Sequence, residues 1–474
     1  MFLLLFFIIS FLIGLTIILF KSRIYATIMT IIFAGLHILF TGFCWMNIGK
    51  NVFEYFTIDY TGVLFLSILS VLSVTTIYHG FIYLEHETTK RYNIYHSALI
   101  ALIVFMSGAY LANGITIVWI FVEATTLAVA ALIYHDRTAA SLEATWKYVF
   151  VCSIGIALAY IGILFLGLTI SGDKMFNLSF SSLSNIISQA DPLYLKITFI
   201  FVLVGYSTKM GLFPMHTVTI DAHTVAPPPV SAFISTTLMN VGFLAIFRVY
   251  LLFSSTSILP FMNHVLILSG ILSILIASGY MLKAKHNKRM LAYSSLENMG
   301  IVAIAIGIGG VGYYAAFLHL ILHSFTKAGL FYQMGQSYKV MGTYQLDDSG
   351  NYMKLFPAGG IVLLLGLICI TAIPPSGLFI SEFMLFKAMV INGNYFCLIL
   401  TSFLLCFVLY ALSTRILHIL FSEPRSIVSR SEVKISFLQT ISQFILFGIV
   451  IYLCFVQPPF LKDTINAIIE NLPK

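Results

Sequence analysis

Charged residues are scarce in this chain. Only 9% of its 474 residues are Asp, Glu, Lys or Arg, and 59% are hydrophobic, whereas a soluble protein carries about 25% charged residues. So few charges cannot build a surface that faces water, and we therefore expect lipid to surround most of the chain. No polar stretch is long enough to fold as a separate soluble domain, so residues 1–474 are predicted to form a single transmembrane domain.

The chain also lacks the sequence patterns of metal and redox cofactor sites. Its six cysteines include no CxxC pair, and most of them lie within apolar runs. They are interpreted as small buried hydrophobic residues rather than disulfides or metal ligands. No spacing typical of an iron–sulfur cluster, a haem or a zinc site is present. The sequence therefore predicts no cofactor and no metal, and any associated redox chemistry must occur in another chain.

Basic clusters are missing as well. The net charge is +7, but Lys and Arg occur singly or in short groups between apolar runs, which is typical of membrane-flanking residues and argues against a nucleic acid partner. They are most frequent in loops after odd-numbered apolar segments, for example at Lys90, Arg137 and Arg289. Because Lys and Arg favour the cytoplasmic side, both termini are predicted on the outer side of a prokaryotic cytoplasmic (inner) membrane.

Apolar segments of membrane-spanning length are abundant. A helix needs about 20 apolar residues to cross the hydrocarbon core, and about fourteen segments meet that length. They cover residues 2–20, 24–47, 62–83, 96–112, 115–134, 147–170, 193–219, 230–253, 261–283, 289–309, 311–337, 357–394, 397–420 and 435–457. The predicted fold is an all-α integral membrane protein with about fourteen transmembrane helices.

Two of these segments contain helix-breaking residues. The seventh is interrupted near Gly211 to Pro214, and the twelfth near Pro374 to Gly377. The breaks lie five segments apart, and an odd offset reverses direction across the membrane, so we expect two inverted five-helix repeats. The predicted division is N-terminal helices at 1–95, a first repeat at 96–253, a second repeat at 254–420 and a C-terminal helix at 421–474.

Charged residues inside the predicted helices need an explanation, because a charge at mid-bilayer costs about 2.5–3.5 kcal/mol. Glu123 lies in the middle of the fifth segment, and Lys209 lies beside the break of the seventh. A carboxylate and an ammonium can exchange a proton, and a helix break makes room for water. The pair is predicted to be part of a proton path. The alternative is a static ion pair that fixes helix packing.

The eleventh segment carries three titratable residues in register. His319, His323 and Lys327 are spaced four apart, so they lie along one helical face over about 12 Å. Histidine both donates and accepts protons near neutral pH, and this row is predicted to continue the path. Glu382 follows the twelfth-segment break and would end the row. Lys387 would snorkel towards the membrane surface or pair with Glu382.

Other polar residues have weaker assignments. Lys147, near the cytoplasmic start of the sixth segment, would either bridge Glu123 to the rest of the path or act as an ordinary flanking charge. Three further residues lie at the cytoplasmic end of the seventh segment: His216, Asp221 and His223. They are expected either to form a proton uptake site or to cap exposed backbone groups. Glu297 is interpreted as a helix-end residue without a clear role.

Five stretches make the sequence similar to a known family. They are WIFVEATTLAVAALIYHDRTAASLEATWKYVFVCSIGIALA, FVLVGYSTKMGLFPMHTVTIDAH with the following PPPVSA, KRMLAYSSLENMGIVAIAIG, HLILHSFTKAGLFY and SGLFISEFMLFKA, which together span about residues 115–390. The chain resembles the antiporter-like membrane subunits of respiratory complex I and membrane-bound hydrogenases, in particular the F subunit of hydrogenase-4 and formate hydrogenlyase-type complexes.

The resemblance assigns roles to individual residues. Family members pair a Glu on the fifth helix with a Lys on the broken seventh helix, and these positions correspond to Glu123 and Lys209. A central axis of Lys and His corresponds to the row on the eleventh segment, and a terminal Glu or Lys corresponds to Glu382. Some complex I subunits have a further Lys where this chain has Asn240. The resemblance therefore implies a gap in the proton path at Asn240, which water or a hydroxyl group must fill. The Trp-Leu-Pro usual before Asp221 is replaced by Val-Thr-Ile.

Three functions are compatible with these features. The first is a proton-translocating subunit of a redox-driven complex, itself without redox chemistry, whose partners are other membrane subunits, a peripheral redox arm, lipid, and protons or sodium. The second is a subunit of a multisubunit sodium/proton antiporter or of a proton-coupled inorganic-carbon uptake system. The third is a structural membrane anchor with an inactive path. The row of titratable residues does not separate the first two, whereas the identity of neighbouring genes would.

Overall fold

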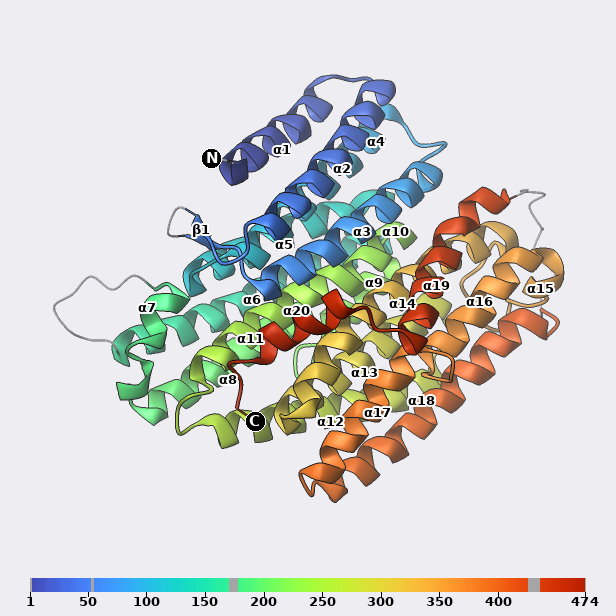
Figure 1. Cartoon of the computed structure of the whole chain (residues 1–474). Coiled ribbons are helices and arrows are strands. Elements are labelled where there is room, and N and C mark those ends of the chain that lie inside the picture. Colours follow the sequence, from blue (N-terminus) through green and yellow to red (C-terminus); the bar gives the residue numbers. More distant parts are fainter. Residues whose placement is uncertain (1, 53–54, 170–177, 425–434, 474) are drawn as a thin grey trace. The chain divides into compact units, whose positions relative to one another are not determined.

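The computed structural model describes residues 2–52, 55–169, 178–424 and 435–473, and the chain is all-α apart from one short β-hairpin (Figure 1). Among the described residues, twelve helices are long and apolar enough to cross a membrane. The predicted all-α membrane fold is therefore confirmed. Helix α14 and the broken pair α16–α17 are outside those twelve, so the total of about fourteen crossings stays a prediction.

The described residues form two compact units. The first unit contains the described residues between Met1 and Pro227, together with Thr237–Met262 and Glu470–Pro473. Its elements are α1 (Phe2–Leu19), α2 (Arg23–Met46), β1 (Asn51–Val52), β2 (Phe56–Thr57), α3 (Tyr60–Tyr83), α4 (Thr89–Leu111), α5 (Ile115–Ile133), η1 (Tyr134–Asp136), α6 (Ala139–Thr169), α7 (Phe180–Ser184), η2 (Ile187–Gln189), α8 (Pro192–Met210), α9 (Thr217–Val225) and α11 (Met239–Phe253).

The second unit contains Pro228–Thr236 and the described residues between Asn263 and Ile469. Its elements are α10 (Pro228–Phe233), most of α12 (Leu259–Lys283), α13 (Asn287–Ile308), α14 (Val311–Met341), α15 (Tyr352–Leu355), α16 (Pro357–Ile370), α17 (Gly377–Ile391), α18 (Tyr395–Phe421), η4 (Phe437–Thr440), α19 (Ile441–Phe455) and α20 (Pro459–Ile469). The π-helical segment η3 (Ile234–Leu238) joins α10 to α11.

Two helices begin earlier than the apolar pattern predicts. Helix α4 starts at Thr89 instead of residue 96, and α6 starts at Ala139 instead of residue 147. Thr138 marks the start of α6, since its Oγ1 accepts a hydrogen bond of 3.0 Å from the Ser141 backbone N–H. Apolar length detects only the apolar part of a helix, so the polar first turns of α4 and α6 are missed, and only that of α6 is set by a capping hydroxyl.

The predicted break of the seventh segment is confirmed. Helix α8 ends at Met210, and Gly211 follows in the left-handed conformation with φ of 70°. Its N–H donates to the Ser207 carbonyl at 2.8 Å, which closes the last turn. Helix α9 then resumes at Thr217, and the Thr219 hydroxyl donates to the Thr208 carbonyl at 3.1 Å. A side chain of the second half therefore satisfies a backbone group that the break leaves open.

The predicted break of the twelfth segment is also confirmed. Helix α16 ends at Ile370 and α17 begins at Gly377. Ser376 connects the two halves, because its hydroxyl donates to the Cys369 carbonyl at 2.9 Å and accepts from the Leu378 N–H at 3.2 Å. One side chain thus caps both helix ends. The inverted relation of the two five-helix repeats stays a prediction.

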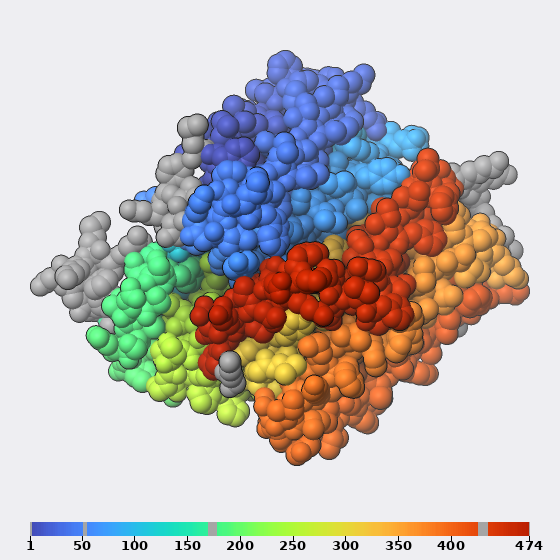
Figure 2. All heavy atoms as spheres, in the orientation of Figure 1, coloured from blue at the N-terminus to red at the C-terminus, as the bar shows by residue number. Residues whose placement is uncertain are grey.

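Helix α20 was not predicted from the sequence. Helix α20 places Leu461, Thr464, Ile465 and Ile468 on its buried side, where it packs against α14. These positions follow the spacing of an amphipathic helix. At eleven residues, α20 is too short for a search based on membrane-spanning length. Figure 2 shows α19 and α20, in red, at the surface of the face in view.

Candidate functional site

The first polar cluster surrounds Lys209 in the first unit. This side chain is 1% exposed and lies in the last turn of α8, where helix carbonyls favour a positive charge. Its Nζ donates to Thr126 Oγ1 on α5 at 2.8 Å and to the Tyr148 hydroxyl on α6 at 3.0 Å. Two neutral hydroxyls from two neighbouring helices therefore hold the lysine.

Glu123 belongs to the same cluster but does not contact Lys209 directly. Its Oε2 accepts from Thr126 Oγ1 at 3.3 Å, and its Oε1 accepts from Ser153 Oγ at 3.2 Å. In the part of the chain that the structure describes, no ion pair joins Glu123 to Lys209, and Thr126 connects them instead. The two predicted residues are thus linked by a threonine that the sequence interpretation left out.

Close helix packing brings this cluster together. A Cβ on Gly205 of α8 would lie 2.5 Å from the Gly155 carbonyl oxygen of α6, and a Cβ on Gly155 would lie 2.5 Å from Thr208 Cγ2. On the other side of α8, a Cβ on Gly242 of α11 would lie 2.4 Å from the Met210 nitrogen. Only glycine allows such approaches of one backbone to another. These contacts fix the end of α8 and hence the place of Lys209.

The second polar cluster lies in the second unit, along α14 and α13. His319, His323 and Lys327 all lie on α14 and are no more than 1% exposed. The Lys327 Nζ donates to the Leu291 carbonyl at 2.6 Å and to the Ser294 hydroxyl, both on α13. As in the first cluster, a buried lysine is held by neutral oxygen atoms from a neighbouring helix.

His319 connects α13 to α17. Its Nε2 lies 3.0 Å from Asn298 Oδ1, and its Nδ1 lies 3.0 Å from Ser381 Oγ. Because the Asn298 amide nitrogen donates elsewhere, its Oδ1 is an acceptor and the imidazole Nε2 must carry a hydrogen. The Nδ1 atom can accept from the Ser381 hydroxyl when the ring is neutral and donate to it when the ring is charged. The contact therefore serves both protonation states.

Glu297 is a buried member of the second cluster, in contrast to the helix-end position expected from the sequence. It lies well inside α13, is 2% exposed, and accepts from Asn298 Nδ2 at 2.5 Å through Oε2. Asn298 thus joins Glu297 to His319. The signal that could have identified Glu297 is its place in the apolar stretch SSLENMGIVAIAIG, where an unpaired carboxylate is costly.

The remaining predicted residues are spread over both units. Lys147 is exposed on α6, where it pairs with Glu143 at 2.5 Å. His216 and His223 are buried at α9, and Asp221 is half-buried there. Asn240 is fully buried at the second position of α11. Lys387 is exposed on α17, and among the described residues it forms no ion pair with Glu382.

The chain is similar to known membrane proteins over most of its length. Residues 112–408 match the family model described as "NADH:quinone oxidoreductase/Mrp antiporter, TM". A hydrogenase-4 component F homolog of Methylacidiphilum infernorum is 32% identical over 403 residues, which cover 83% of this chain and 84% of that protein.

Two solved structures share the fold. A chain of the membrane-bound sulfane sulfur reductase, an archaeal respiratory membrane complex, superposes with a TM-score of 0.86 at 21% identity, over 99% of this chain and 96% of that chain. A chain of the Mrp complex from Dietzia superposes with a TM-score of 0.85 at 16% identity, with the same coverage. At these identities the likeness establishes the fold only.

Proposed function

The chain belongs to the NADH:quinone oxidoreductase/Mrp antiporter transmembrane family, and from that premise we propose that it translocates protons as a membrane subunit of a larger redox-driven complex. One observation carries the proposal. Two lysines, Lys209 on α8 and Lys327 on α14, are buried and are held by hydroxyl and carbonyl oxygens. A buried charge without function would be strongly disfavoured there.

The contacts of Lys209 suit proton exchange better than static packing. A hydroxyl group accepts a hydrogen bond from an ammonium and donates one to a neutral amine. Tyr148 can therefore accept from the charged Lys209 or donate to the neutral one, while Thr126 accepts from a Lys209 N–H in either state. Thr126 also donates to Glu123, which supplies a carboxylate one step away. A direct ion pair would instead stabilise only the charged state.

The second cluster supplies the same chemistry with histidine. Lys327 and His319 both contact α13, and Asn298 places Glu297 next to His319. His323 lies one turn from each along α14, and Asn240 and the buried groups near His216 are further candidates for the path. We propose that protons move through both clusters and that Glu382 lies at the release end. Lys147 and Lys387 are exposed and are assigned no step.

The test measures proton uptake in closed vesicles that contain the complete complex, purified through a tag on this chain. Lys209→Met and Glu123→Gln are each expected to lower coupled proton uptake by about a hundredfold, because general acid–base groups contribute at least that much. Lys196→Met, on the same helix α8, is the matched control and should pump normally. Wild-type proton uptake in an assembled Lys209→Met complex would show that the chain is a structural anchor.

The proposal includes the surroundings of the chain. Its partners would be other membrane subunits of the same complex and, through them, a peripheral redox arm that carries the electron transfer. We place it in a prokaryotic cytoplasmic membrane with both termini outside, since the Lys- and Arg-rich loops favour the cytoplasmic side. Labelling of single cysteines introduced near either terminus, by reagents that do not cross the membrane, tests that orientation in intact cells.

A second candidate function is a subunit of a sodium/proton antiporter. It is favoured by the family itself, which includes Mrp antiporter proteins, and by the fold shared with the Dietzia Mrp complex. The two candidates differ in what drives transport. Proton movement that requires electron transfer and is unaffected by sodium supports the redox-driven complex, whereas proton movement that follows a sodium gradient without electron transfer supports the antiporter.

A further inference from the structure

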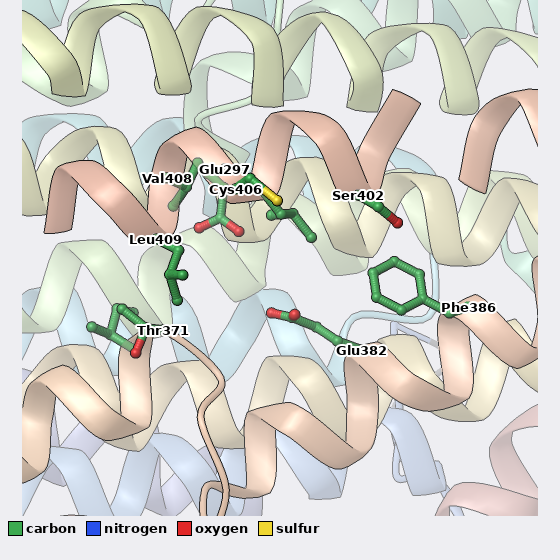
Figure 3. A pocket seen from close by; sticks show the side chains of 10 residues that line it. Glu297, Thr371, Glu382, Phe386, Ser402, Cys406, Val408 and Leu409 are labelled. Carbon is green, nitrogen blue, oxygen red and sulfur yellow. The ribbon is translucent and has the colours of Figure 1, made fainter. Parts of the chain in front are cut away.

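A cavity of about 210 Å³ lies within the second unit, between helices α13, α16, α17 and α18. Its polar lining consists of Glu297, Thr371, Glu382, Ser402 and Cys406, and apolar side chains such as Phe386 complete the wall (Figure 3). This volume can hold several water molecules. Cys406 is exposed, so the cavity is reached from outside the chain.

Both carboxylates turn into this cavity, as Figure 3 shows. Glu297 comes from α13 and is 2% exposed, and Glu382 comes from α17. One Glu297 oxygen accepts from Asn298, while no described residue donates to its other oxygen or to the Glu382 carboxylate. The lining contains no Lys, Arg or His. Lys327 lies outside this lining but interacts electrostatically with Glu297. The buried Glu297 and the half-buried Glu382 are therefore two acids directed at one space, and a single lysine can balance only one of them.

Two facing carboxylates in an apolar surrounding cannot both carry a charge unless a cation lies between them. A transition metal or Ca²⁺ would need more ligands than this site offers, and the described residues contain no group of three metal-binding side chains. A proton shared by the two acids, or one Na⁺ with water and the hydroxyls of Thr371 and Ser402, satisfies the same charge requirement.

We propose that Glu297 and Glu382 form a binding site for one small monovalent cation, a proton or Na⁺, within this cavity. The site deepens the proposed function, on which it rests, as the place where the ion leaves the second cluster. His319 contacts residues beside both acids, because Asn298 binds Glu297 and Ser381 directly precedes Glu382. The cavity has room for water between the two carboxylates.

The native Cys406 gives a first test of the cavity in the purified, assembled complex. Cationic and anionic methanethiosulfonates of similar size are reacted with the thiol, and the Cys406→Ser variant gives the background rate. The carboxylate pair predicts that the cationic reagent reacts about tenfold faster, since it attracts positive ions. The double variant Glu297→Gln with Glu382→Gln should lose this preference, and Glu423→Gln, in the same unit outside the cavity, should keep it.

Infrared difference spectra of the same complexes identify the cation. A protonated-carboxyl band that is absent from the double variant is expected in the wild-type protein. If added Na⁺ removes this band, the site binds Na⁺; if only alkaline pH removes it, the site binds a proton. Equal labelling rates for the two reagents, an unreactive Cys406, or identical spectra for the wild type and the double variant would overturn the proposal.

The Lys209→Met variant separates this inference from the proposed function. It should lose proton uptake but retain both the labelling preference at Cys406 and the carboxyl band, because Lys209 belongs to the other unit. If the Lys209→Met complex takes up protons normally and Cys406 still reacts faster with the cationic reagent, the translocation function is refuted and the cation site is supported. The site is supported if the preference for the cationic reagent is lost in the Glu297→Gln/Glu382→Gln double variant and kept in Lys209→Met.

Discussion

At the scale of single residues, Thr126 connects the two charged residues of the first cluster, Lys209 and Glu123. Its Oγ1 accepts from Lys209 Nζ at 2.8 Å and donates to Glu123 Oε2 at 3.3 Å. The hydroxyl therefore contacts both predicted partners. It also explains how a lysine and a glutamate can exchange a proton without forming a direct ion pair.

We expect Thr126→Val to slow coupled proton uptake by about tenfold, which equals the ~1.4 kcal/mol of one lost hydrogen bond to a charged group. Valine keeps the shape of threonine but removes the hydroxyl, so Lys209 and Glu123 lose their connection. Proton uptake in vesicles of the complete complex measures the effect. Thr126→Ser keeps the hydroxyl and should restore most of the rate; an equally slow serine variant would show that the methyl group matters instead.

At the scale of helices, glycines decide where the polar side chains meet. Helices α6 and α8 approach each other at Gly155 and Gly205, where an added Cβ would come within 3 Å of neighbouring atoms. The same two helices carry Tyr148, Ser153 and Lys209. Small residues at this crossing are thus what allows hydroxyls of one helix to reach the lysine of the other.

Gly205→Val is expected to reduce the amount of folded, assembled protein strongly, because overpacking in a tight contact costs about 1–3 kcal/mol or more. Gly167→Val is the matched control, since Gly167 lies on α6 with no atom within 4 Å of an added Cβ. Size-exclusion profiles of the detergent-solubilised complex compare the two variants. A monodisperse Gly205→Val complex with normal yield would show that the crossing adapts to larger side chains.

At the scale of the whole molecule, each compact unit has its own polar cluster, and the first unit is also held together by an ion pair between its helices. In the first unit, Arg248 of α11 pairs with Asp59 at 3.1 Å and donates to the Tyr110 carbonyl at 2.8 Å. Asp59 in turn accepts from the Gly62 N–H at the start of α3. Arg248 therefore joins α11 to the start of α3 and the end of α4, although no pattern in the sequence distinguishes it from other arginines.

Arg248→Met should destabilise the first unit by about 1.5–3 kcal/mol, the value of hydrogen bonds to a charged group. The loss leaves the Tyr110 carbonyl and the half-exposed Asp59 without their partner. Hydrogen exchange of the complete complex is expected to speed up at the start of α3 and the end of α4. Exchange in α13 and α14, which belong to the other unit, serves as the internal reference; equal acceleration there would indicate general unfolding.

The sequence by itself determined the membrane fold, because lipid solvation requires long apolar runs and those runs are read directly from the chain. It also determined both helix breaks, since Gly211, Pro214 and the Pro374-Pro375 pair disfavour a continued helix, and it identified the charged residues within α5, α8 and α14. These features depend on residues close together along the chain.

Only the tertiary structure decided which of those charges touch, and through what. Nothing in the sequence distinguishes Thr126, Asn298 and Ser381 from other polar residues. They belong to the clusters because helix packing brings Lys209 within hydrogen-bonding distance of Thr126, and His319 within that distance of Asn298 and Ser381. Glu297 could not be paired with Glu382 from sequence, since they come from α13 and α17. Contacts between distant segments depend on helix packing, which the local apolar pattern does not encode.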